Sequence, residues 1–508
     1  MARGLAPLRH RGFRFLVGGQ LASNVGDAFY AVALPWYVLA EHGGPLLLGT
    51  VLAAYGVPRT VLLAVGGHAS DRWRPWTVMM TSDSVRALAV AALAVAAASG
   101  PARAVVLVPI AAVLGAGEGL FLPGSFAIVP VLLPDEELQS GNALASAVTQ
   151  LATLAGPAVG GALVALAGPA PAFAVDAATF AVSALTLAGV RSAQRSARVN
   201  GAGPVAVPVT VPGAQEDSLQ SAAEPASSGA RAGGVGASRV PGLAPGGGNR
   251  GDDAGSPTVW KLLRSERILQ ISLLVTLAAN LGSAGADEVA LPALVHGPLR
   301  GSAGGYGSLI AAFGAGALLG TLVAAQARQA RRPAVLGSLV FLGEALFLAV
   351  VPFVGGLITI GTAIAAVGIC NGFGNVVMIT VFQRWAPPNL LGRLTGLLML
   401  CSFGVFPISV ALGALVVHNY GPALFFPLAA ALLAAAILAG LSQRSWRDFG
   451  AAGEASPAPS PRRLPADRRP RPGVAVGRRG ARPARGAEPD RLRTGGGGVA
   501  PAGHRPAR

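Results

Sequence analysis

Twelve long apolar runs set the strongest limit on what this chain can fold into. Each holds about 20 or more mostly apolar residues, the length that an α-helix needs to cross a bilayer. The runs lack the ten-residue alternation of a lipid-facing β-strand, and backbone groups in lipid must be hydrogen-bonded, so we predict an all-α, polytopic membrane protein. The runs cover about residues 14–40, 46–68, 76–99, 104–133, 138–166, 170–190, 266–296, 304–326, 333–353, 356–386, 389–417 and 421–441.

The composition favours the same class of protein. Hydrophobic residues make up 52% and charged residues 12% of the 508 residues, whereas about 25% of a soluble protein is charged. A water-soluble fold of this size would need more charge to cover its surface, so we exclude an ordinary soluble enzyme and a long disordered protein. Much of the net charge of +16 comes from the Arg-rich end of the chain, and we expect no nucleic-acid partner.

Two stretches lack an apolar pattern and divide the chain. Residues 191–265 are rich in Gly, Ala, Ser and Pro, and residues 442–508 form a basic tail with many Arg-Pro and Arg-Arg pairs. Both are predicted to be mostly disordered. The remaining parts are a short N-terminal segment (1–13), a first six-helix bundle (14–190) and a second six-helix bundle (266–441).

The arginines favour one orientation in the membrane. Loops on the same side as the N-terminus contain most of them, for example Arg72, Arg191 and Arg331, whereas the opposite loops contain only Arg103 and Arg300. Because positive residues collect in cytoplasmic loops, we predict a multi-pass protein of the cell membrane. Both termini and the linker are expected in the cytoplasm.

The two halves of the chain repeat each other in order. The matching stretches are Leu21–Gly26 with Leu277–Gly282, Val32–Pro35 with Val289–Pro292 after one residue of slip, and Gly168–Pro169 with Gly421–Pro422. Equivalent spans lie six apart, and an even separation preserves direction across the membrane. The repeat therefore predicts twelve transmembrane helices in two parallel six-helix repeats.

Four short stretches resemble motifs of a known family. They are Asn24–Asp27, Gly67–Arg72, Gly156–Gly161 and Asp176–Phe180. Together with the repeat, they make residues 10–445 resemble the major facilitator superfamily, and within it bacterial exporters of the enterobactin-exporter and macrolide-efflux type. The resemblance implies the major facilitator fold and a secondary-active transporter with alternating access. It also places Gly115 where many proton-coupled drug exporters carry an arginine.

Polar residues inside the apolar runs are the candidates for substrate binding and proton coupling. A charge deep in a span costs about 2.5–3.5 kcal/mol on insertion scales, so it normally faces a bundle interior or a wet cavity. The candidates are Asn24, Asp27, Arg59, Glu118, Asp176, Asn280, Asp287, Glu288, Asn371 and Asn375. Each could instead form a structural ion pair or an interhelical hydrogen bond.

Three expectations about position accompany these candidates. Arg59 could pair with a cavity carboxylate such as Asp27. Asp176 is expected near the outer end of its span, where water can solvate it. Glu344 is left out of the candidate set because its span is peripheral by analogy with the family.

Two further groups are expected to act on the conformational change. By resemblance, the signature inner loop supplies the gating residues Gly67, Asp71 and Arg72, and the pair Asp83 and Arg86, one turn apart on a helix, is expected to support them. The exporter-type motif consists of Gly156, Pro157, Gly160 and Gly161. Its glycines allow close helix contact and its proline bends the helix.

These features predict a transporter and not an enzyme. The sequence has no P-loop, no metal-ligand spacing and no catalytic motif, so we expect no cofactor, no bound metal and no ATP drive. We predict a monomeric exporter of a small amphiphilic molecule, such as a drug, antibiotic or siderophore, driven by proton antiport and surrounded by lipids. The alternatives are an importer or facilitator of the same fold and, less favoured, a membrane-embedded enzyme.

Overall fold

The structure is a computed structural model that describes residues 5–199, 263–326, 330–386 and 390–450. It leaves out the side chains of residues 64–72, 193–199 and 391–393 within helices. Most of the predicted linker and nearly all of the basic tail therefore lie outside the described residues. In the described part of the chain every regular element is a helix.

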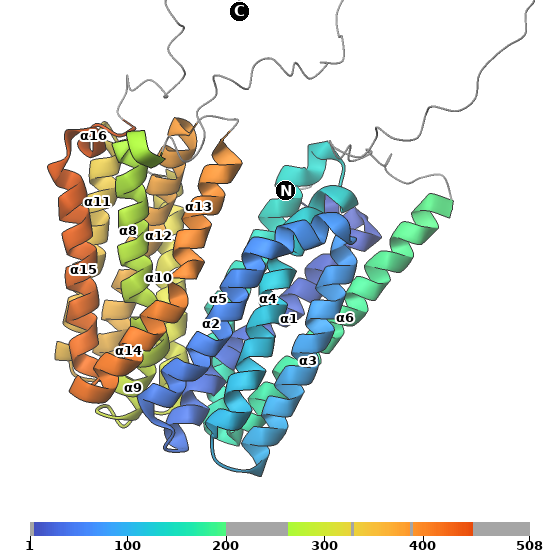
Figure 1. The fold of residues 1–508 in the computed structure, drawn as a ribbon, viewed down its shortest axis with the longest axis horizontal. Coiled ribbons are helices and arrows are strands. Elements are labelled where there is room, and N and C mark those ends of the chain that lie inside the picture. The colour runs from blue at the N-terminus through green and yellow to red at the C-terminus, as the bar shows by residue number, and fades with distance from the viewer. Residues whose placement is uncertain (1–4, 200–262, 327–329, 387–389, 451–508) are drawn as a thin grey trace, which may run out of the picture. The chain divides into compact units, whose positions relative to one another are not determined.

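Six long helices form the first bundle, coloured blue to green in Figure 1. They are α1 (Arg11–Ala40), α2 (Gly44–Arg72), α3 (Pro75–Ser99), α4 (Ala104–Leu132), α5 (Leu138–Ala167) and α6 (Pro169–Val199). Short connections join them, so successive helices run antiparallel. Helix α6 continues beyond the predicted end at residue 190.

The second bundle repeats this plan with two interrupted spans. Its elements are α8 (Arg267–Gly285), η3 (Ala286–Ala290), α9 (Leu291–His296), α10 (Ala303–Gln326), α11 (Pro333–Val350), α12 (Leu357–Trp385), α13 (Leu391–Gly404), α14 (Phe406–Tyr420) and α15 (Pro422–Ser442), followed by the short α16 (Arg444–Arg447). Among the described residues, eleven spans are long and apolar enough to cross a membrane, and α1 is the twelfth predicted span. The all-α prediction is confirmed.

Two local features show that the halves are built alike. Gly168 and Gly421 end α5 and α14 with φ values of 82° and 85°, a region that favours glycine, and a proline begins the next helix in both cases. Asn24 of α1 donates a 3.3 Å hydrogen bond to the Thr149 hydroxyl of α5. Asn280 of α8 likewise lies 3.5 Å from the Ser402 hydroxyl of α13. Both asparagine candidates therefore join the first and fifth spans of their bundles.

The one-residue slip in the repeat has a structural cause. Asn24 and Asn280 are 256 residues apart, whereas Val32 and Val289 are 257 apart. Between these positions the second bundle contains η3, a π-helical segment, and a π-bulge accommodates one extra residue in a helix. The Asp287 backbone carbonyl in this segment accepts a 3.3 Å hydrogen bond from the Tyr306 hydroxyl of α10.

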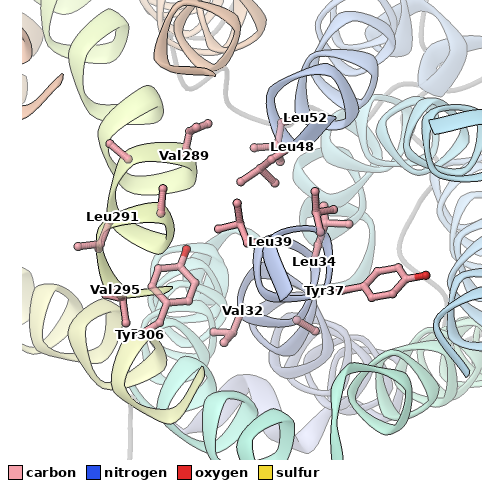
Figure 2. Packing of buried hydrophobic residues seen from close by; sticks show 14 of the residues in the cluster. Val32, Leu34, Tyr37, Leu39, Leu48, Leu52, Val289, Leu291, Val295 and Tyr306 are labelled. Carbon is pink, nitrogen blue, oxygen red and sulfur yellow. The ribbon is translucent and has the colours of Figure 1, made fainter. Parts of the chain in front are cut away.

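We call the end of each bundle where its first helix begins the start side, and the opposite end the far side. A buried apolar cluster joins the two bundles on the far side, and we call it the far-side core. Figure 2 shows some of its members, which include Val32, Leu34, Leu39, Leu48 and Leu52 from the first bundle and Val289, Leu291, Val295 and Tyr306 from the second. The Trp36 and His296 rings also meet edge to face, with centroids 5.2 Å apart.

The exporter-type motif lies at a close approach between the two bundles. A Cβ atom at Gly161 of α5 would lie 2.7 Å from the Ala303 carbonyl oxygen of α10 and 3.0 Å from the Gly307 Cα atom. A Cβ atom at Gly307 would overlap the Pro157 carbonyl oxygen. Gly156 and Gly160 face α1 instead. The motif therefore packs α5 against α1 on one face and against α10 on the other.

Replacing Gly307 by Leu is expected to destabilise this contact. The added side chain would force α5 and α10 apart, and overpacking of this kind costs about 1–3 kcal/mol. We expect a lower melting temperature for the detergent-solubilised protein. Gly18→Leu is the matched control, because a Cβ atom at Gly18 would meet nothing within 4 Å. Equal melting temperatures for the two variants would contradict this description of the interface.

Candidate transport site

A buried arginine links three helices of the first bundle. The Arg86 side chain of α3 is 6% exposed, and its Nη2 atom lies 2.7 Å from Oδ1 of Asp27 in α1. Its Nη1 atom lies 3.7 Å from Oδ1 of Asp83, one turn earlier in α3. The Ser183 hydroxyl of α6 donates a 2.6 Å hydrogen bond to Oδ2 of Asp83. The guanidinium also stacks on Phe180 of α6, 4.0 Å from the ring centroid, and so connects α1, α3 and α6.

Asp27 is the accessible member of this group. Its side chain is 43% exposed, whereas that of Asp83 is fully buried. The expected spacing of Asp83 and Arg86 is present, but the shorter contact of Arg86 is with Asp27. Asp83 and Arg86 therefore belong to the same polar cluster as Asp27. From the sequence, Asp83 and Arg86 were expected to support the gate, and Asp27 was a separate cavity candidate.

A second ion pair lies between α2 and α4. The Arg59 Nη2 atom lies 2.9 Å from Oε1 of Glu118, and both side chains are mostly buried. The Arg59 guanidinium carbon lies 4.5 Å from the ring centroid of Phe403 in α13, across the bundle interface. Arg59 thus pairs with a cavity carboxylate, as suggested from the sequence, but the partner is Glu118 and not the example Asp27. Arg59 also contacts both bundles.

Glycines of α4 explain this pairing. A Cβ atom at Gly115 would overlap the Tyr55 carbonyl group, and one at Gly119 would lie 2.5 Å from the Arg59 carbonyl oxygen. Helix α4 therefore packs directly on α2, and Glu118 is held beside Arg59. An arginine at position 115 would not fit without moving α2, so the cation of this site comes from α2 instead.

Asp176 is not solvated at the end of its span, contrary to the prediction. It is 1% exposed and lies where α6 crosses Gly26 of α1. Its Oδ2 atom has no hydrogen-bond partner among the described residues. The buried face of α6 contains residues spaced alternately by three and four, namely Phe173, Asp176, Phe180, Ser183, Leu187 and Val190. This helical periodicity indicates that Asp176 is on the buried face of α6. The prediction of a solvated Asp176 considered only its position near the end of the span.

The interior of the first bundle holds more carboxyl groups than cations. The carboxyl groups are those of Asp27, Asp83, Glu118 and Asp176, and the cations among the described interior residues are Arg59 and Arg86. An unpaired carboxylate in a buried site is costly. This arrangement is chemically suited to taking up protons or to pairing with a positively charged molecule.

A cavity of about 430 Å³ lies between α5 of the first bundle and α10 and α12 of the second. Apolar side chains form much of its wall, and polar groups come from both bundles. Its lining includes Gln150, Thr153, Phe313, Leu318, Thr321, Asn371, Asn375, Val376, Ile379 and Thr380. A mostly apolar wall with a few placed polar groups is typical of small-molecule sites. The candidates Asn371 and Asn375 therefore face a cavity.

The structure brings Glu344 into contact with these asparagines. The Asn371 amide donates a 3.1 Å hydrogen bond to Oε1 of Glu344 in α11, and the Asn375 amide donates a 3.0 Å hydrogen bond to Oδ1 of Asn371. Glu344 is 7% exposed. Glu344 was expected to be peripheral, yet it is hydrogen-bonded to a cavity-lining residue. The four-residue spacing of Asn371 and Asn375 places both on one face of α12. This spacing was the sequence signal that the two asparagines form one polar group.

The other candidates are placed as follows. Asp287 is exposed and Glu288 is half-buried, both in η3. Gly67, Asp71 and Arg72 lie in the last turns of α2, and their side chains lie outside the described part of the chain.

Comparisons with known proteins bear on the family and on the fold. The MFS_3 family model, described as a transmembrane secretion effector, matches residues 2–202. Residues of this chain are 31% identical over 187 positions to the multidrug efflux pump Tap of Mycolicibacterium fortuitum, covering 35% of this chain and 46% of that protein. They are 28% identical over 178 positions to the uncharacterized MFS-type transporter YfiS of Bacillus subtilis, covering 35% of this chain and 42% of that one. The chain thus spans less than half the length of these relatives.

Solved structures match over a longer range. A POT family transporter in complex with 5-aminolevulinic acid has a TM-score of 0.60 at 12% identity, covering 85% of this chain and 96% of the other. The chain has the major facilitator fold. A bacterial homologue of the iron transporter ferroportin, with a TM-score of 0.59 at 15% identity, shares it over 84% of this chain and 98% of that one. The matches confirm the fold that the four motifs indicated, and the matched proteins named here are described as a multidrug efflux pump or as transporters.

Proposed function

We propose that this protein of the major facilitator fold is a secondary-active exporter in the cell membrane, which expels a small amphiphilic molecule in exchange for protons. The two bundles rock about a central site, so that the site opens to one side of the membrane at a time. The relatives named as multidrug efflux pumps support export over import. The mixed apolar and polar cavity supports an amphiphilic substrate.

The position of Arg59 is the observation that carries the proposal. Its guanidinium forms an ion pair with Glu118 in the first bundle and stacks on Phe403 in the second. A proton taken up by Glu118 removes the charge that holds Arg59 in place. Protonation in one bundle then changes a contact with the other bundle, which is what coupling a proton to a rocking motion requires.

The contacts between the bundles support an inward-open state. They run from Trp36 and His296 on the far side to Thr60, whose hydroxyl donates a 3.1 Å hydrogen bond to the Phe403 carbonyl oxygen. The arginine distribution favours a cytoplasmic start side. With that orientation, the far-side core is the closed extracellular gate, and Gly67, Asp71 and Arg72 act at the cytoplasmic gate when the protein faces outward.

Transport into everted membrane vesicles tests the proposal. Vesicles that contain the protein are given a panel of amphiphilic antibiotics and dyes and are energised so that their lumen becomes acidic. We expect at least one compound to accumulate beyond the level in vesicles without the protein, and the accumulation to collapse when nigericin removes the pH gradient. Accumulation that survives nigericin would contradict proton antiport, and accumulation only in right-side-out vesicles would favour the importer alternative.

A further inference from the structure

A buried carboxyl group in the second bundle is connected to the cavity by two carboxamides. Glu344 of α11 accepts a hydrogen bond from Asn371 of α12, and Asn371 accepts one from Asn375. Asn371 and Asn375 line the cavity, whereas Glu344 does not. The second oxygen of Glu344 is buried and has no partner among the described residues, and no described basic side chain forms an ion pair with Glu344.

The carboxylate fixes the direction of this chain of hydrogen bonds. When Glu344 is ionised, its oxygens accept and do not donate, and Asn371 turns its NH₂ group to Glu344 and its carbonyl oxygen to Asn375. The Asn375 NH₂ group in turn donates a hydrogen bond to Oδ1 of Asn371. The Asn375 carbonyl oxygen is left for the cavity, because no described residue donates to it, and the Asn375 side chain is exposed.

The aligned amides carry the effect of the buried charge to the cavity. Hydrogen bonds in a chain polarise one another, and the low dielectric of the interior strengthens each of them. The Asn375 oxygen is therefore a stronger acceptor than an isolated amide. A positively charged N–H donor is its best partner, because charge-assisted hydrogen bonds are about twice as strong as neutral ones.

The rest of the cavity suits the apolar part of such a ligand. Phe313, Leu318 and Ile379 form apolar wall, and an aromatic face also attracts cations. Thr321 and Thr380 add neutral hydroxyl groups, and no acidic or basic side chain lines the cavity among the described residues. The polarised Asn375 oxygen and the Phe313 ring are then the features of this wall that favour a cation over a neutral molecule.

We infer that Glu344, Asn371 and Asn375 form a subsite that binds the protonated amine or guanidinium group of an amphiphilic ligand. Asn375 contacts the ligand, and Glu344 acts through the asparagines as a positioning residue. The inference rests on the proposed function in taking this cavity as the substrate cavity. It adds a substrate class that depends on the second bundle and is separate from the ion pairs of the first.

Equilibrium binding to the detergent-solubilised full chain tests the subsite without any gradient. The probes are 1-naphthylmethylamine, which is a cation at neutral pH, and the neutral 1-naphthylmethanol of similar shape. We expect the wild-type protein to bind the amine at least tenfold more tightly than the alcohol. Glu344→Gln removes the charge and lets the amide chain reverse, so the preference should fall below threefold while the alcohol affinity changes less than twofold.

A second variant separates positioning from folding. Asn375→Asp puts a charge at the cavity itself, so in the Glu344→Gln background it should restore the preference for the amine. Thr362→Val on the same helix is the control, since the Thr362 hydroxyl bonds only its own helix, and it should leave both affinities unchanged. If Glu344→Gln does not fold, Asn375→Ala should abolish the preference in its place.

The outcomes distinguish this subsite from the proposed function. Equal binding of the two probes by the wild-type protein, no binding of either, or an unchanged preference in Glu344→Gln or Asn375→Ala would overturn the subsite. A tenfold preference with no transport in vesicles would support the subsite and contradict the exporter proposal. Proton-driven transport with no amine preference would do the reverse.

Discussion

Arg86→Met is expected to abolish transport and to destabilise the protein more than any other single change to the first bundle. The variant leaves Asp27 and Asp83 without the guanidinium that lies 2.7 Å and 3.7 Å from them. Removing one partner of a buried ion pair typically costs about 3–5 kcal/mol, because an uncompensated buried charge remains. We expect vesicle transport to fall to background and the melting temperature in detergent to drop by several degrees.

Two further variants make this result specific. Asp27→Asn in the Arg86→Met background removes one of the abandoned charges and should recover part of the lost stability without restoring transport. Arg103→Met is the matched control, because Arg103 is exposed at the start of α4. If Arg86→Met transports and melts like Arg103→Met, the polar cluster around Arg86 carries neither stability nor function.

Glu118→Gln is expected to lose gradient-driven accumulation by at least tenfold while keeping downhill exchange. Glutamine keeps the size of the side chain and can still accept a hydrogen bond from Arg59, but it has no charge and takes up no proton. Transport that depends on a proton at this position therefore fails, whereas binding and rocking without a gradient remain. Uptake into everted vesicles and exchange of preloaded substrate measure the two activities separately.

The control for this variant is a glutamate outside the site. Glu41 directly follows α1 on the far side and is exposed. The variant Glu41→Gln should therefore leave both activities unchanged. Loss of exchange together with accumulation in Glu118→Gln would indicate a structural ion pair with Arg59, not a proton carrier.

The spans and the repeat could be predicted from the sequence because they depend on properties local to each helix. Apolar length fixes the spans, and the Gly-Pro pairs at Gly168 and Gly421 have the same backbone conformation in both halves. Even the π-helical segment was visible, as the one-residue slip between Val32 and Val289. The backbone structure was needed to locate the extra residue in η3, since a slip in sequence does not say where the extra residue is accommodated.

The partners of the charged residues could not be predicted in the same way. Which carboxylate reaches Arg59 depends on how closely α4 approaches α2, and Gly115 and Gly119 set that distance across the helix interface. Sequence spacing ranks residues along one helix only. It therefore suggested Asp27 for Arg59 and left Glu344 aside, although both choices depend on contacts between helices.

The gating residues of the signature loop remain predictions. Asp71 is expected to hold the cytoplasmic side closed through a helix N-terminus or an arginine, a contact worth about 0.3–1 kcal/mol. The ion pairs described above lie at a different level of the first bundle, within the buried part of α2, α3 and α4. Gate and coupling site are therefore separable by mutation in principle.

The most direct test of the central claim is proton-driven uptake by the double variant Asp27→Asn/Glu118→Gln in everted vesicles, measured beside the wild-type protein. Asp27 and Glu118 are the carboxyl partners of Arg86 and Arg59 in the interior of the first bundle. Their side chains are 43% and 17% exposed, respectively. We predict that the double variant exchanges substrate downhill but accumulates none when the lumen is acidified. Full gradient-driven accumulation by the double variant would contradict proton coupling through this site.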